Sequence, residues 1–346
     1  MFNGDSPQMG RISRATGRTT LAAVAEQAGV STMTASRAIN HPEGVSAAIR
    51  ARIDQAISDL GYVPNRAARA LASAQSNVIV VLVPSLSNAV FSAVLDGIQD
   101  AVRPAKFQIL IGNTRYRDAE EESLLDTYLQ SNPDGILLCG LVHSARVEQL
   151  LASSKVPRVY MMDLSDQPGR LEVGFSQFEA GCTMTRYLID KGRKRIGFIG
   201  AQLDERTMRR AEGYRKAMQD ANLADSRLEI MVPNPSTVAL GAELLGRMIA
   251  RVPDCDAIFC CNDDLAHGAI FQAQRRGIAV PDQLAICGFN DLPTSAWMNP
   301  SVTTIGTPRY QIGFEAGSLL CAAIQGEASI TQHIDLGFTL LARESA

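Results

Sequence analysis

The chain has no apolar run long enough to cross a membrane, and it is poor in aromatic residues. Only 5% of its 346 residues are aromatic, with a single Trp. A membrane-spanning helix needs about 20 consecutive apolar residues, so we expect no membrane partner. The first 18 residues are polar and lack the apolar core of a signal peptide. We predict a disordered tail over residues 1–18.

Motifs of metal and catalytic chemistry are also missing. The seven cysteines include no CxxC pair, and His267 has no second metal ligand at helical spacing. No GxSxG, Walker A or GxGxxG motif stands between a strand and a helix. We interpret Asp263 and Asp264 as a charge pair at a helix N-terminus. We therefore expect no metal, no cofactor and no enzymatic activity, and the unpaired thiols are typical of a cytoplasmic protein.

What the sequence does contain, near its start, is a series of short helical patterns. Thr20 is an N-cap residue for a first helix, and Gly29 supplies the turn that ends it. Ser31 then caps a second helix over residues 32–40, with Ile39 facing inward. Two short helices joined by a glycine turn form a helix-turn-helix, whose second helix enters the major groove of DNA.

A third helix and a short fourth one follow. Ser46 is the N-cap of the third helix, in which isoleucines recur at helical spacing, and Gly61 ends this helix. Asn65 could cap an Ala-rich helix that is too short to be stable alone in water. We expect that helix to form only when it packs against something. The domains that we predict are the tail 1–18, a DNA-binding head 19–64, a hinge helix 65–74 and a body 75–346.

Charge supports a DNA-binding head. Residues 11–73 hold eight arginines and four acidic residues, whereas the whole chain has a net charge of −3. A basic segment on an acidic chain is typical of DNA binding, because phosphate neutralisation dominates affinity. Helical periodicity alone leaves an alternative open, namely an ordinary three-helix surface domain with solvated arginines.

The segments TLAAVAEQAGVSTMTASRAIN and GYVPNRAARALA decide between these readings. They resemble the N-terminal region of the LacI/GalR family of transcriptional repressors, without gaps from Thr20 to about Ser73. The resemblance implies a homodimer on palindromic double-stranded operator DNA. It implies base readers at Thr32, Met33 and Arg37, and backbone contacts at Ser31, Thr34, Ser36, Asn40, Ser46 and Tyr62. In the hinge it implies minor-groove contacts from Asn65 and Ala68, with Leu71 as an apolar wedge.

The body alternates apolar strand-like runs with helical patterns. Continuous apolar strands between helices predict parallel sheets covered on both faces. The fold class that we predict is an all-α head plus an α/β body of two doubly wound parallel-sheet lobes. We expect chain crossovers between the lobes near residues 163–172 and 291–303. Because ligands in such folds bind at the carboxyl ends of the strands, the lobes would enclose a cleft there.

The body also resembles the LacI/GalR core and, through it, the periplasmic sugar-binding proteins. Landmarks are DGILLCG, KGRKRIGFIGA and GIAVPDQLAICGFND. The segments HPEGVS, GAQLDERT, VGFSQFEA and DLGFTL are similar to the gluconate-operon repressors within the family. The effector implied is a sugar acid such as gluconate or 2-ketogluconate, and the resemblance favours release of DNA when it binds. A different sugar or a phosphorylated sugar acid remains an alternative.

The chemistry of a sugar acid selects candidate effector-binding residues. A carboxylate needs a cation, and one arginine can bind it through two charge-assisted hydrogen bonds. The resemblance aligns the family's sugar-contacting arginine with Arg210, and Arg206 stands closer to a strand end. A strand-end asparagine is commonly a helix cap, and for Asn262 and Asn290 both roles are compatible. The full set is Asn88, Phe91, Asp163, Phe175, Arg206, Arg210, Asn262 and Asn290.

Two other classes of protein share such a body. One is a ligand-binding or transport module, against which the basic head and the missing signal peptide argue. The other is a sugar-metabolising enzyme, for which no nucleophile, base and orienting group occur together. The last residues, LGFTLLARESA, show no leucine heptad, which argues against a tetramer-forming C-terminal helix.

Overall fold

The computed structural model describes residues 19–63, 75–165, 167–327 and 332–346. It divides into two compact units, Met1–Ala74 and Gln75–Ala346, each of which is described by itself. The predicted tail 1–18 lies outside the described residues, as do Asn65, Ala68 and Leu71 of the predicted hinge. No helix among the described residues is long and apolar enough to span a membrane.

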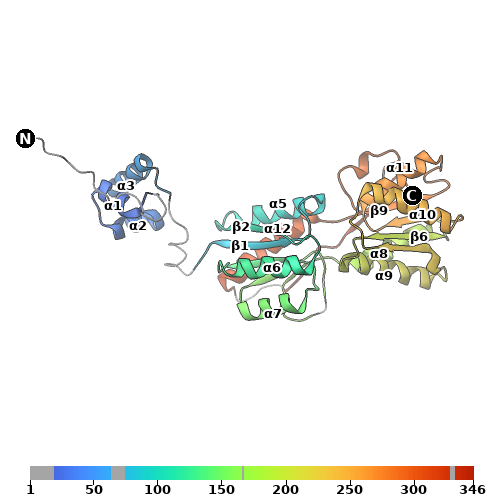
Figure 1. Ribbon diagram of the computed structural model, residues 1–346, viewed down its shortest axis with the longest axis horizontal. Helices are drawn as coiled ribbons and strands as arrows, with labels where there is room; N and C mark the ends of the chain where they lie inside the picture. The colour runs from blue at the N-terminus through green and yellow to red at the C-terminus, as the bar shows by residue number, and fades with distance from the viewer. Residues whose placement is uncertain (1–18, 64–74, 166, 328–331) are drawn as a thin grey trace, which may run out of the picture. The chain divides into compact units, whose positions relative to one another are not determined.

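The head consists of three helices, as the sequence predicts (Figure 1). Thr20 and Ser31 each accept a hydrogen bond from a backbone N–H of the helix that they cap. Gly29 and Gly61 end their helices in the left-handed conformation, at φ 63° and 57°. Ser46 is the N-cap residue of α3, as predicted, although its side chain makes no cap bond. The elements are α1 (Leu21–Ala28), α2 (Thr32–Asn40), η1 (Pro42–Gly44) and α3 (Ala47–Leu60).

Small side chains let the three helices of the head pack closely. Val24, Ala28, Ala38, Ile53 and Ala56 form its buried core, and Ile39, predicted to face inward, is half-buried. The Arg52 guanidinium donates to the carbonyls of Ala28 and Gly29 at the end of α1. Arg52 therefore closes a helix terminus that would otherwise leave acceptors unpaired.

The first lobe of the body is a six-stranded, fully parallel sheet in the order β11-β5-β4-β3-β1-β2. Helices α5 and α12 lie against one face of it, and α6 and α7 against the other (Figure 1). Its elements are β1 (Val78–Val83), α5 (Ala89–Val102), β2 (Gln108–Asn113), α6 (Asp118–Leu129), β3 (Gly135–Cys139), α7 (Ala145–Ser154), β4 (Arg158–Met161), β5 (Glu172–Gly174), α12 (Arg309–Gln325) and β11 (His333–Asp335).

The second lobe repeats this plan with the order β12-β10-β9-β8-β6-β7. Only β12 runs antiparallel to its neighbour. Its helices pair as α8 with α9 and α10 with α11, on opposite faces of the sheet (Figure 1). Its elements are α8 (Gln177–Asp190), β6 (Ile196–Ala201), α9 (Glu205–Asp220), η2 (Ser226–Leu228), β7 (Glu229–Val232), α10 (Val238–Arg251), β8 (Ala257–Cys260), α11 (Asp263–Arg275), β9 (Ala285–Asn290), η3 (Ser295–Trp297), β10 (Thr303–Gly306) and β12 (Thr339–Leu341).

The chain crosses between the lobes three times, and the predicted crossovers need correction. Strand β5 still pairs with β4, so the first crossing follows Gly174 rather than the segment 163–172. The segment 291–303 stays in the second lobe, because β10 pairs with β9. The second crossing lies between β10 and α12, and a third, not predicted, lies between β11 and β12. Short edge strands of three or four residues carry too little pattern to be seen in the sequence.

Glycines allow the paired helices of the body to touch through their backbones. A Cβ on Gly213 of α9 would lie 2.1 Å from the Phe178 carbonyl oxygen of α8, and one on Gly181 of α8 would lie 2.4 Å from that of Arg210. Gly268 of α11 and Gly313 of α12 make equally close approaches to α10 and α5. The distance between α8 and α9 is therefore set by residues without a side chain.

We expect Gly213→Ala to lower the melting temperature of the protein by about 2–8 °C, because the added methyl group meets backbone that cannot move aside. Gly246→Ala is the matched control, since its Cβ would meet only the mobile end of the Arg276 side chain. Thermal unfolding monitored by circular dichroism measures both. Equal melting temperatures for the two variants would contradict the packing argument.

Candidate functional site

A cavity of about 430 Å³ lies between the two lobes of the body, at the carboxyl ends of β1, β6, β8 and β9. This volume falls in the range of small-molecule sites. Six of the eight expected effector-binding residues line it, namely Asn88, Phe91, Arg206, Arg210, Asn262 and Asn290.

Arg206 enters the cavity from the first turn of α9 and is already neutralised. Its guanidinium forms an ion pair with Asp204 and lies 5.3 Å from the centre of the Phe91 ring. Burial alone would lower the pKa of Arg206, but the Asp204 carboxylate raises it above its usual value. The arginine in turn holds the pKa of Asp204 low against the effect of burial. This pair stays ionised and carries no net charge.

Arg210 lies one turn further along α9 and has no such partner. Its Nε donates to the Gln177 Oε1 at 2.8 Å, and its Nη1 donates to the Cys261 carbonyl at 2.7 Å. The guanidinium carbon lies 3.7 Å from the centre of the Phe289 ring. Burial lowers the pKa of Arg210 to about 10. Among the described residues no carboxylate lies within ion-pair distance of it, and its side chain is only 6% exposed.

The cavity asparagines belong to two types. Asn88 and Asn262 cap α5 and α11, where each Oδ1 accepts a backbone N–H. The Asn262 Nδ2 also bonds Ser236 at 2.7 Å. Asn290 ends β9 with φ at 104° and caps no helix. Its buried side chain is thus held by a strained backbone rather than by a capping bond.

Asp163 and Phe175 lie beside the cavity rather than in its lining. Asp163 is buried, and its Oδ1 accepts from the Leu164 N–H at 2.9 Å. Burial raises the pKa of Asp163 to about 6. Phe175 is fully buried and stacks with Phe289 at 6.3 Å between ring centres. Phe175 therefore packs on the ring that lies against the Arg210 guanidinium.

Several lining residues were not expected from the sequence. Asp264 makes no hydrogen bond or ion pair with any described residue, and burial raises its pKa. It stands two residues after Asn262, near the strand end that selected that asparagine, but its acidic neighbour Asp263 suggested a helix-terminus role instead. Tyr116 and Arg115 come from the β2–α6 loop, whose sequence shows no periodicity to mark it.

Backbone strain is concentrated around the cavity. Arg115, Tyr116, Met162, Gln202 and Asn290 all line it and all have positive φ, between 53° and 104°. Non-glycine residues adopt this region rarely, and such residues tend to cluster at functional sites. No group of three or more His, Cys, Asp or Glu side chains in the described ranges is placed to hold a metal ion.

In the head, the predicted DNA-contacting residues lie on α2 and its flanks. Thr32, Met33 and Arg37 are exposed, Met33 by 73%. Arg37 has no polar partner among the residues that the structure describes, so its guanidinium is available to a ligand. Thr34 bonds Ser31, and Asn40 bonds Ser36. Ser46 is exposed and Tyr62 half-buried.

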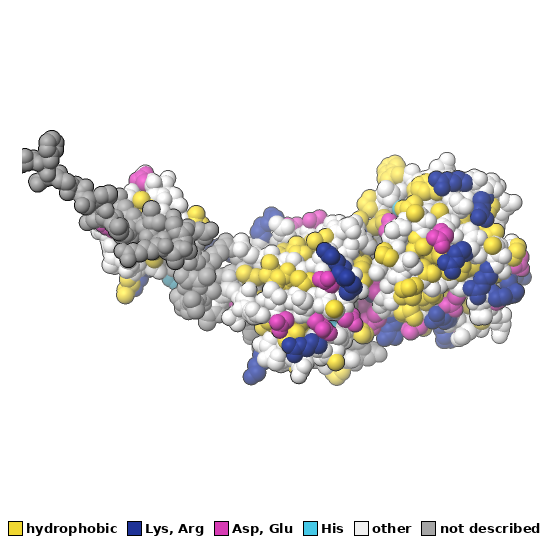
Figure 2. All heavy atoms as spheres, viewed as in Figure 1, with side chains coloured by type: hydrophobic (Ala, Val, Ile, Leu, Met, Phe, Trp, Pro, Cys, Tyr) yellow, Lys and Arg dark blue, Asp and Glu magenta, His cyan; other side chains and the backbone are white. Residues whose placement is uncertain are grey.

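The charge of the described head differs from that of the longer segment. Residues 19–63 hold three arginines and four acidic residues, so the helices themselves are not basic. The arginines that make residues 11–73 basic stand at positions 11, 14, 18, 66 and 69, outside the described residues. On the body, the face in Figure 2 shows charged side chains of both signs scattered over the two lobes.

Comparison with known proteins agrees with both units. A model of the lacI family of bacterial regulatory proteins matches residues 20–65, and one of a periplasmic binding protein-like domain matches residues 185–346. The HTH-type transcriptional regulator GntR of Pseudomonas aeruginosa is 47% identical over 333 residues, which are 96% of this chain and 97% of that protein.

The chain belongs to the LacI family. The crystal structure of transcription regulator GntR from Chromobacterium violaceum is 50% identical and matches 78% of this chain and 98% of that one, with a TM-score of 0.76. The lac repressor dimer bound to operator and the anti-inducer ONPF, at 24% identity, shares the fold over 95% of this chain and 99% of that one, with a TM-score of 0.84.

Membership confirms the predicted fold class and the predicted function as a DNA-binding transcriptional regulator. As a LacI-family protein, the chain is a DNA-binding transcriptional regulator. The roles of individual residues in its head and cavity stay predictions.

The raised pKa of Asp163 predicts a pH-dependent effect of Asp163→Asn. The folded chain binds this proton more tightly than the unfolded chain, at a pKa of about 6 against 3.8. Ionisation therefore destabilises the fold as pH rises through this window, and the cost is complete above about pH 6. Between about pH 4 and pH 7, the free energy of unfolding of the neutral variant should rise above that of the wild type by up to ~3 kcal/mol.

Melting temperatures of both proteins at unit steps of pH measure this effect. The exposed Asp96→Asn is the control and should follow the wild type. Parallel curves for Asp163→Asn and the wild type would show that Asp163 titrates normally.

Proposed function

We propose that the effector of this regulator is a sugar acid, bound in the cavity between the lobes with its carboxylate on Arg210. The observation that carries the proposal is the buried guanidinium of Arg210, whose hydrogen-bond partners among the described residues are a neutral amide and a carbonyl. Gluconate is the first compound to test, because the sequence resembles the gluconate-operon repressors.

An acid suits this cavity better than a neutral sugar does. A buried charge without a counter-ion is costly, and the lowered pKa of Arg210 reflects that cost. A ligand carboxylate would supply the missing charge through two parallel hydrogen bonds. A neutral sugar would leave Arg210 unpaired. Arg206 is the weaker candidate, because Asp204 already occupies its guanidinium.

The rest of the lining suits a polyhydroxy chain. Asn88, Asn262 and Asn290 offer amide donors and acceptors. Asp264 is an acceptor without a partner among the described residues, so it suits a hydroxyl donor. The Phe91 ring supplies an apolar face. The proposal keeps Asp163 and Phe175 as supports of these residues, not as ligands.

In the proposed mechanism the effector shifts a population of body conformations. A ligand that touches both lobes favours one lobe arrangement over another, and only this difference in affinity can act on the DNA-binding head. A difference of about 1–3 kcal/mol changes operator affinity roughly 5- to 150-fold. We propose that binding releases the operator through the segment 65–74. The function proposed includes no enzymatic step.

We expect Arg210→Gln to weaken gluconate binding by roughly 30-fold or more, because a buried charged pair is lost. Arg209→Gln is the matched control, since Arg209 is the exposed neighbour on the same helix. Isothermal titration calorimetry measures affinity, and operator binding by Arg210→Gln should persist but no longer respond to gluconate. Equal affinities for the two variants would exclude Arg210 as the carboxylate ligand.

In the head, we expect Arg37→Ala to weaken specific operator binding by about 1–3 kcal/mol, since its free guanidinium suits a base edge. Arg50→Ala, which removes an exposed arginine paired with Asp54, serves as control. Fluorescence anisotropy with an operator selected from random-sequence DNA compares them. Gluconate affinity should be unchanged in both. A loss as large with Arg50→Ala would indicate general electrostatics rather than base reading.

A further inference from the structure

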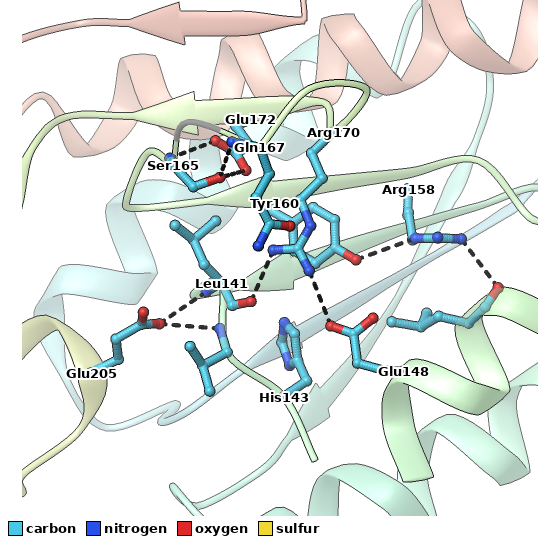
Figure 3. Close-up of polar contacts among 12 residues, drawn as sticks. Leu141, His143, Glu148, Arg158, Tyr160, Ser165, Gln167, Arg170, Glu172 and Glu205 are labelled. Carbon is cyan, nitrogen blue, oxygen red and sulfur yellow. Dashed lines mark hydrogen bonds and ion pairs between the residues drawn. The ribbon is translucent and has the colours of Figure 1, made fainter. Parts of the chain in front are cut away.

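A second contact joins the two lobes outside the cavity. The Glu205 carboxylate, in the first turn of α9, accepts from the Leu141 N–H at 3.4 Å and the Val142 N–H at 3.1 Å (Figure 3). Glu205 belongs to the second lobe, and residues 141–142 follow β3 of the first lobe. Glu205 does not line the cavity. Two successive backbone N–H groups aimed at one oxygen form an anion-binding site.

Contacts within the first lobe hold the loop that Glu205 binds. Arg170 donates to the Leu141 carbonyl at 3.0 Å and to Glu148 at 3.2 Å, and it stacks over the Tyr160 ring (Figure 3). Ser144 bonds Glu122 just after the loop. With its carbonyl fixed, Leu141 turns its N–H toward the second lobe.

Glu205 stands between two residues of the cavity, Asp204 and Arg206. Next to it, Arg206 also reaches the first lobe, through the Cys139 Sγ at 3.4 Å and the Phe91 ring. The start of α9 therefore touches the first lobe on both sides of the ion pair that forms the cavity wall. A substitution at Glu205 removes a contact between the lobes without removing any side chain that lines the cavity.

We propose that Glu205 is a positioning residue for effector recognition, which holds the lobes at the separation where Arg206 and Arg210 of the second lobe face Asn88 and Phe91 of the first across the cavity. This inference rests on the proposed effector site. Without the contact, a smaller fraction of the protein has the binding-competent arrangement, and apparent affinity falls by that fraction.

The chain offers a matched control on the same helix. Glu205 and Glu212 both pair with Arg209, at 4.0 and 3.4 Å, but no described contact joins Glu212 to the first lobe. Glu205→Ala and Glu212→Ala therefore remove the same charge beside the same arginine. Glu205→Gln keeps an acceptor oxygen for the two N–H groups. Arg170→Gln disturbs the contact from the first-lobe side alone.

Two measurements on the full-length protein test the proposal. Calorimetric titration with gluconate should show roughly 5- to 30-fold weaker binding for Glu205→Ala, a smaller loss for Glu205→Gln and Arg170→Gln, and less than twofold for Glu212→Ala. Hydrogen exchange by mass spectrometry should show faster exchange of the Leu141 and Val142 amides in Glu205→Ala than in Glu212→Ala or the wild type. These amides have no other acceptor among the described residues.

The outcomes separate this inference from the proposed function. If Glu205→Ala binds gluconate as well as Glu212→Ala does, the positioning role is wrong, whether or not amide exchange changes. If the wild type binds no sugar acid, the proposed function fails first. In that case unchanged exchange at residues 141–142 would also overturn the inter-lobe contact, and faster exchange in Glu205→Ala would support it.

Discussion

The body is organised around one buried cation, which forms no ion pair with any described carboxylate. Arg210 is held by Gln177, by the Cys261 carbonyl and by the face of Phe289, so its position is fixed while its charge stays unpaired. These three partners come from α8, from the end of β8 and from β9. An arginine that was paired with a carboxylate would be a structural ion pair. An arginine fixed by neutral groups is instead prepared for an anion from outside.

This arrangement depends on how closely α8 approaches α9. Gly181 and Gly213 let the two backbones touch, and only at that distance does Gln177 meet the Arg210 Nε. Gln177 is fixed in turn by donating to the Met162 carbonyl at 2.7 Å. Met162 follows β4 of the first lobe, so the chain of contacts from Arg210 reaches across the crossing. The missing side chains of Gly181 and Gly213 therefore help to determine where the Arg210 guanidinium lies.

Sequence reasoning found what periodicity and strand ends encode. The helix caps, the long central strands and five cavity residues follow from local pattern and from the rule that sites lie at carboxyl ends of parallel strands, whereas Arg210 follows from the resemblance to the LacI/GalR family. The short strands β5, β7, β10, β11 and β12, which lie at or next to a sheet edge, were not predicted, because so few residues show no clear period and owe their pairing to distant neighbours. Asp264 was not predicted to line the cavity, because its place at a helix N-terminus already accounts for an acidic side chain. Only its burial without a partner among the described residues indicates the second role, as a lining residue. Glu205 gave no signal at all, since its acceptor role depends on a loop of the other lobe.

The charge of the head explains why control at the hinge would be effective. The helices of residues 19–63 carry more acidic residues than arginines, so in the proposed mechanism they contribute base contacts rather than attraction to phosphate. The basic residues lie on either side, at positions 11, 14, 18, 66 and 69. Phosphate neutralisation supplies much of the affinity for DNA. In the proposed mechanism the effector acts on the segment that contains Arg66 and Arg69. A ligand that displaces this segment therefore removes part of the electrostatic attraction, while α2 keeps its specificity and the dimer can bind again when the effector leaves.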